Sequence, residues 1–145
     1  MGIVSVENNL TTLDEYYAFV NSRLSKLYDG VSNCIGTGLF GTGEVDSDEY
    51  LWGDEPNDIL NRLEESDVPF RGMLISWGHN NKGHTSRKHF HLGIIMNSDP
   101  ILVTNRATRE GDVHYKQSID SISPVYPDNK FTEKYLVPRK LEPLL

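Results

Sequence analysis

One cysteine and a group of histidines are the residues best suited to covalent chemistry in this sequence. Cys34 is the only cysteine among 145 residues and lies in VSNCIGTGLF (31–40), at the expected start of a short helix. A helix N-terminus directs unpaired N–H groups and partial positive charge at a thiol, which lowers its pKa. Four of the five histidines fall between residues 79 and 91. Cys34 is therefore a candidate nucleophile, provided that a histidine lies beside it.

His91 and Asn105 are placed to complete such a site. His91 opens the apolar run HLGIIM, and Asn105 follows the next apolar run, in ILVTNRA. If the two runs form an antiparallel hairpin around NSDP, both residues fall near the same end, within about 5 Å of each other. An imidazole can take the thiol proton, and a side-chain amide can hold the ring in one tautomer. We expect Cys34 to be the nucleophile, His91 the base and Asn105 the residue that orients the ring.

The substrate side of the site is expected around the same elements. The backbone N–H of Cys34 would face a developing oxyanion, assisted by a group near Tyr28 or Ser32. Aromatic rings can line a groove or pack in a core, and Trp52 and Trp77 are open to both interpretations. Arg106 and Arg109 can clamp a carboxylate or serve as ordinary loop charges. The residues expected to bind the substrate or the oxyanion are Tyr28, Ser32, Asn33, Trp77 and His89.

Other interpretations of the same residues stay open. A lone cysteine is often inert packing, and Asn105 is also a common type of turn residue. His89 and His91 are two positions apart, so on a regular strand both would project from one face. With His84 or His79 from the adjoining loop they could bind zinc. We expect no metal and no other cofactor, and keep a histidine-based metal protein as an alternative.

The helices and strands that must position these residues can be predicted from the spacing of apolar residues, which changes along the chain. Helical spacing and capping residues predict helices at 11–30, from about Cys34 onward, and at 56–67. From residue 70 the pattern favours about five strands, in FRGMLISWG, KHFHLGIIM, PILVTNRA, DVHYKQSI and KFTEKYLVP. This order predicts one α+β domain over 1–145, with a helical part at about 11–67 and an antiparallel sheet at about 70–139.

The composition and charge argue against some classes of binding partner. The formal charge of −7 and the pI near 5.1 argue against binding to nucleic acid or to an anionic membrane. A single cysteine cannot form an internal disulfide. The first residues lack the pattern of a secretory leader, and no apolar run is long enough to span a bilayer. We expect a cytoplasmic protein, or one exported without a cleaved signal peptide.

The order of motifs resembles the NlpC-type papain-fold cell-wall peptidases. The resemblance rests on NC at 33–34, GMLISWG, HLGIIM, VTNR at 103–106, VHYKQSI and YLVPR. It implies a papain-like domain that cleaves an amide bond in a peptide or a peptidoglycan fragment, with Cys34, His91 and Asn105 as its catalytic residues. The sequence departs from the family where Asn33 replaces the usual Asp and Ile35-Gly36 the usual Ser-Gly.

The function expected from these observations is a thiol hydrolase that forms an acyl-enzyme on Cys34. Acyl transfer or deamidation at the same site differs only in the acceptor. A non-catalytic binding module on the same fold and a histidine-rich metal protein are the alternatives from other classes. If the protein is an exported effector, a protein inhibitor is an expected partner.

Overall fold

The longest helices lie in the first half of the chain. In the computed structural model, residues 9–28, 31–80, 87–106, 112–122 and 132–145 are described. Helix α1 begins where Thr12 accepts a hydrogen bond from the Glu15 N–H. The helices are α1 (Leu13–Leu24), α2 (Cys34–Gly41), α3 (Asp54–Asn61), α4 (Ile119–Ile122) and the 3-10 turn η2 (Glu142–Leu144). In the described ranges, every helix is too short or too polar to cross a lipid bilayer.

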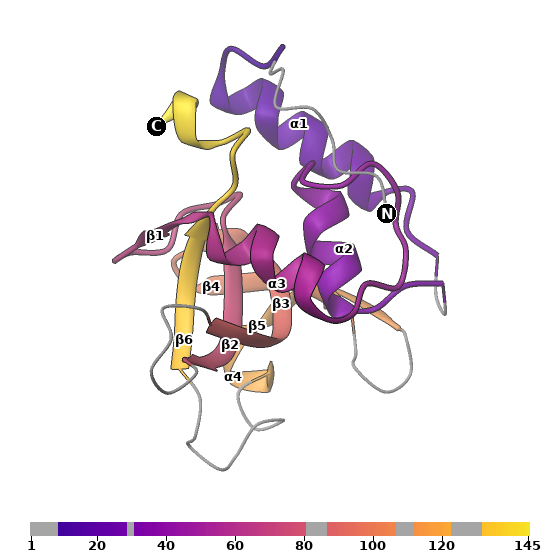
Figure 1. The fold of residues 1–145 in the computed structure, drawn as a ribbon. Coiled ribbons are helices and arrows are strands. Elements are labelled where there is room, and N and C mark those ends of the chain that lie inside the picture. Colours follow the sequence, from indigo (N-terminus) through magenta and orange to yellow (C-terminus); the bar gives the residue numbers. More distant parts are fainter. Residues whose placement is uncertain (1–8, 29–30, 81–86, 107–111, 123–131) are drawn as a thin grey trace.

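The second half of the chain forms an antiparallel sheet of six strands (Figure 1). The strand order is β1-β6-β2-β3-β4-β5. The strands β3 and β4 form the hairpin expected around NSDP, with Gly93 opposite Asn105. The strand bounds are β1 (Glu64–Ser66), β2 (Leu74–Asn80), β3 (Arg87–Ser98), β4 (Ile101–Arg106), β5 (Val113–Ser118) and β6 (Thr132–Val137).

The expected α+β class and the antiparallel sheet are confirmed, and two boundaries were wrong. The helix predicted at 56–67 ends at Asn61, and residues 64–66 form β1, which pairs with β6. Pairing with β6 thus makes a strand of a segment whose own sequence pattern predicts a helix. The first helix ends at Leu24 rather than near Gly30, because Ser25 begins a turn that closes on Asn21 and Arg23.

Small residues bring α2 close to the centre of the sheet. A Cβ on Gly38 would collide with Leu92, and one on Gly41 would collide with Ile94. Leu92 and Ile94 therefore point toward α2, and successive side chains alternate between the faces of a strand. His91, between Phe90 and Leu92, points to the other face, where its ring packs against its cross-strand partner Trp77. The glycines of CIGTGLFG thus set how closely Cys34 approaches β3.

Candidate active site

Cys34 is the first residue of α2, as expected. The Asn33 side chain caps this helix, accepting a hydrogen bond from the Gly36 N–H at 2.9 Å. The same amide pairs with both backbone groups of Leu51, its Oδ1 accepting from the N–H at 3.2 Å and its Nδ2 donating to the carbonyl at 2.7 Å. Asn33 therefore fixes the start of α2 against the loop that precedes α3. Asn33 thereby positions Cys34, and it also lines the cleft described below.

The Cys34 sulfur lies against the strand segment centred on His91. Sγ donates to the Phe90 carbonyl at 3.7 Å, and the Leu92 N–H also approaches the sulfur. Both backbone groups of Ile95 form hydrogen bonds on the β2 side of β3. Because the backbone groups of successive residues alternate between the two sides of an antiparallel strand, those of Phe90 and Leu92 point toward β4. The paired register of β4 ends at Asn105, opposite Gly93. The sulfur thus occupies the edge of β3 just past the last paired residue of β4.

His91 and Asn105 are brought together, as the hairpin predicts. The ring Nε2 lies 3.0 Å from Asn105 Oδ1. Asn105 Nδ2 donates to Gln117 Oε1 on β5 at 2.8 Å, which turns its Oδ1 toward the ring. A carbonyl oxygen only accepts, so Nε2 carries the proton and Nδ1 is the basic nitrogen. Gln117 was not predicted from the sequence, because it lies on β5, two strands away from His91, and no local pattern marks it.

Burial governs the charge of both groups. Burial raises the pKa of the Cys34 thiol to about 11, although the N–H groups of Leu92, Ile35 and Cys34 act in the opposite direction. Burial lowers the pKa of His91 to about 4, although the hydrogen bond that the ring donates to Asn105 raises it. At neutral pH the resting site therefore holds a neutral thiol and a neutral imidazole. The helix N-terminus was expected to lower the pKa of the thiol, but burial outweighs that effect.

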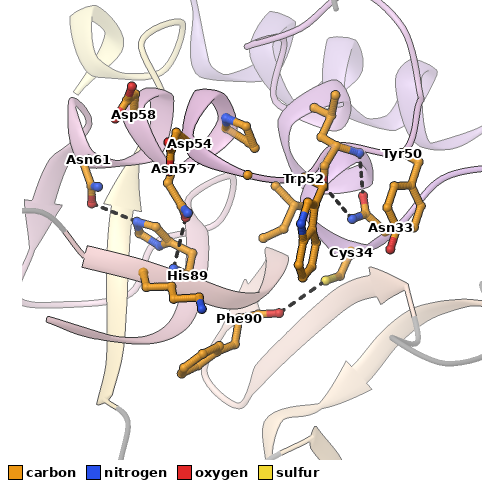
Figure 2. Close-up of a pocket in the computed structure, with 15 residues that line it drawn as sticks. Asn33, Cys34, Tyr50, Trp52, Asp54, Asn57, Asp58, Asn61, His89 and Phe90 are labelled. Atoms are coloured by element: carbon orange, nitrogen blue, oxygen red, sulfur yellow. Dashed lines mark hydrogen bonds between the residues drawn. The ribbon is translucent and has the colours of Figure 1, made fainter. Parts of the chain in front are cut away.

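A cleft of about 480 Å³ opens beside Cys34 (Figure 2). Cys34 is only 4% exposed and lies at its inner end, next to the Phe90 carbonyl. Trp52, which is 80% exposed, lies beside the cysteine in Figure 2, on the side toward His89. The remaining labelled lining residues are Asn33, Tyr50, Asp54, Asn57, Asp58, Asn61 and His89.

His89 lines this cleft, but on the face of the sheet opposite to His91. His89 pairs with Gly78 and His91 with Trp77, so Phe90 is an extra residue in a β-bulge. The bulge turns His89 toward Ser76 and α3. The expectation that His89 and His91 share one face was wrong for this reason.

Helix α3 holds His89 in place through two asparagines one turn apart. His89 Nε2 lies 2.9 Å from Asn61 Oδ1, and its Nδ1 lies 2.5 Å from Ser76 Oγ. Asn57 Oδ1 accepts from the His89 backbone N–H at 3.1 Å. Both ring nitrogens are thus engaged in hydrogen bonds, which favours a positioning role over catalysis or metal binding.

The zinc alternative gains no support from the described part of the chain. There, no three His, Cys, Asp or Glu side chains are grouped as they would be around a metal ion. His79 packs its ring on Phe90 at a centroid distance of 4.7 Å. His84 lies outside the described residues, as does Arg109.

Three residues expected near the substrate lie elsewhere. The Tyr28 side chain is 71% exposed and does not line the cleft. Trp77 is fully buried, packs on His91 and donates from Nε1 to Glu133 at 2.9 Å. Arg106 is also fully buried and forms an ion pair with Asp48 at 3.0 Å, so it cannot clamp a substrate carboxylate. Trp52, not Trp77, is the tryptophan in the cleft.

Ser32 is close to Cys34 but is already engaged. Its hydroxyl donates to the Glu49 carbonyl at 3.0 Å, and the residue is buried. The oxyanion donors that the geometry offers are the backbone N–H groups at the start of α2, beginning with that of Cys34.

Comparison with known proteins adds no relatives. No protein-family model, no curated protein and no solved structure matches the chain. The function must therefore be argued from the site itself.

Proposed function

We propose that the protein is a thiol-dependent acyl hydrolase or acyltransferase acting on an amide bond, with Cys34 as nucleophile. The observation that carries the proposal is the position of its sulfur at the inner end of the cleft, against the backbone on either side of His91. Asn105 and Gln117 orient the His91 ring. The order of nucleophile helix, base strand and orienting strand also supports a papain-like, NlpC-type architecture.

Because both groups are neutral at rest, we propose general-base catalysis rather than attack by a preformed thiolate. The sulfur lies at the edge of β3, level with the backbone on either side of His91, whose ring lies on the other face of the sheet. In the proposed reaction the sulfur attacks the substrate carbonyl and its proton passes around this edge to His91 Nδ1, while the carbonyl becomes an oxyanion facing the Cys34 N–H. The same proton then goes to the leaving amine, the C–N bond breaks and a thioester remains on Cys34. Water or another nucleophile, deprotonated by His91, releases the acyl group and restores the thiol. A peptide or a peptidoglycan stem fragment is the expected substrate class.

A test uses p-nitrophenyl acetate, an activated acyl donor. We expect a burst of p-nitrophenol and one acetyl group on Cys34, detected by mass spectrometry. Cys34→Ala abolishes the burst, and His91→Gln slows it by roughly a hundredfold or more, the usual size of a general-base contribution. The acylation rate should stay constant between the pKa of His91, which is about 4, and the pKa of the thiol, which is about 11, where the thiolate begins to react directly.

The control is His114→Gln, the same substitution at an exposed position. A burst that survives in Cys34→Ala, or an equal rate in His91→Gln and His114→Gln, contradicts the proposal. Iodoacetamide, which needs the thiolate, should alkylate the resting enzyme slowly until the pH nears 11.

The raised pKa of the thiol also favours a second candidate, a non-catalytic binding module. Such a module would bind ligands in the cleft but show no burst, and its slow alkylation would not change in His91→Gln.

A further inference from the structure

The two long walls of the cleft differ in charge. The wall formed by α3 carries Asp54 and Asp58, one helical turn apart, and both side chains are exposed and line the cleft. The opposite wall, formed by β3, carries Lys88. An acidic residue in the first turn of a helix is explained by the helix dipole, which accounts for Asp54. Asp58 lies one turn further on, where that explanation weakens.

Among the residues that the structure describes, neither carboxylate forms an ion pair. Across the described ranges, the acidic residues in ion pairs are Asp48, Glu44 and Glu65, and the pairs of Asp48 and Glu44 lie behind α2, away from the cleft. Lys88 is the one cation in the described lining of the cleft, and it lies on the opposite wall without an ion pair to either carboxylate, so both carboxylates are available to a cationic ligand. The net charge of −7 also attracts cations to the surface as a whole.

Two exposed aromatic side chains complete the arrangement. Tyr50 and Trp52 are 66% and 80% exposed and line the same cleft. An exposed tryptophan is costly to leave in water, and its ring face attracts ammonium and guanidinium groups more strongly than that of any other side chain. Figure 2 places Trp52 between Cys34 and the start of α3, so a ligand reaching from the sulfur to the carboxylates passes the indole.

From this arrangement we infer that the cleft selects acyl substrates with a cationic side chain, an amine or a guanidinium, next to the amide bond attacked by Cys34. The cation contacts Trp52 and the carboxylates of Asp54 and Asp58, while Lys88 disfavours a second cation on the strand wall. The inference rests on the proposed function for the reaction, but the charge preference of the cleft can be tested without catalysis.

The single cysteine makes a direct test with charged thiol reagents possible. Cationic, neutral and anionic methanethiosulfonates (ethyltrimethylammonium, methyl and ethylsulfonate) modify Cys34 by the same exchange, in which the thiolate displaces sulfinate and forms a mixed disulfide. Dividing each rate by that of the neutral reagent removes differences in thiol pKa and burial. At low salt we expect the cationic reagent to react faster than the anionic one, relative to their rates with a free thiol.

Charge-neutral variants then locate the effect. Asp54→Asn and Asp58→Asn should each lower the ratio of cationic to anionic rates about fivefold, and added salt should reduce the difference. Glu55→Gln is the matched control, because Glu55 lies on the same helix, is exposed and does not line the cleft. A ratio that favours the anionic reagent, or falls equally in Glu55→Gln, overturns the inference.

A binding measurement gives a second readout. Nα-acetyl-lysine methylamide should quench the exposed Trp52, whereas the isosteric norleucine derivative should bind at least tenfold more weakly. Trp77 is fully buried, so the change should disappear in Trp52→Phe. Equal binding of the two probes also overturns the inference. Failure of the proposed reaction would appear separately, as the absence of a His91-dependent acetyl burst.

Discussion

At the scale of single residues, the burial of His91 makes stability depend on pH. The pKa of this ring falls from an ordinary 6.5 to about 4 in the folded protein. Above pH 6.5 the ring is neutral in both states. Below it, the unfolded chain binds a proton that the folded protein does not, so the free energy of unfolding falls as the pH drops toward 4. The loss from this group approaches about 3 kcal/mol.

His91→Gln should remove this part of the acid sensitivity. Urea unfolding near neutral pH and near pH 4 would measure it, and the parent should lose more stability between the two than the variant does. His114→Gln should behave like the parent, because its ring is exposed. An unchanged difference in His91→Gln would show that the acid sensitivity arises from other groups.

The chemically distinctive residues were the ones that could be found from the sequence. Cys34 at a helix start and the pairing of His91 with Asn105 followed from strand order and the NSDP turn. The assignment of Trp77 failed because alternation along a strand does not reveal which face is covered. The bulge at Phe90, which separates the two histidines, leaves no mark in an alternating pattern.

At the scale of elements, Asn33 holds both the start of α2 and the loop before α3. Asn33→Ala removes the helix cap and two hydrogen bonds to Leu51, and should destabilise the protein by roughly 2–3 kcal/mol. Asn33→Asp keeps an acceptor for the Gly36 N–H but loses the donor to the Leu51 carbonyl. Its loss should be clearly smaller.

Chemical denaturation of these two variants would measure the difference. Equal losses would mean that the bond to the Leu51 carbonyl, rather than the cap, carries the effect. Amide exchange at Gly36 would report on the cap directly, and should rise in Asn33→Ala more than in Asn33→Asp.

Element types were predicted better than element ends. The strand patterns after residue 70 are long enough to impose their period, and each corresponds to a strand of the sheet. The segment Glu64–Ser66 is too short to do so, and its conformation comes from pairing with β6. Contacts between distant parts of the chain determine the conformation of such short segments. For this reason the end of α3 could not be predicted from the local sequence.

At the scale of the whole molecule, a buried ion pair and its hydrogen bonds join α2 to the sheet. Arg106, the residue after Asn105, donates to Thr37 on α2 at 2.7 Å, to the Tyr28 carbonyl at 2.7 Å and to Asp48 at 3.0 Å. Arg106→Met leaves Asp48 without its cation, and should cost about 3–5 kcal/mol. Lys134→Met, which removes a partly exposed pair with Glu65, should cost about 1 kcal/mol or less.

Thermal unfolding followed by circular dichroism would compare the two variants. Equal shifts in Tm would mean that Arg106 contributes no more than a surface charge. Sequence alone could not identify this pair, because its partners lie 58 and 69 positions away along the chain.

The pairing of the Asn33 amide with Leu51 has a consequence for how this protein can diversify. Tyr50 and Trp52 flank Leu51, so the two aromatic residues are tied to Asn33, the residue before Cys34, through the backbone between them rather than through their own side chains. We therefore expect an exchange of either ring to change the ligand that the cleft admits while Cys34 keeps its position. Positions 50 and 52 are accordingly where evolution or protein engineering can alter ligand preference without disturbing the start of α2.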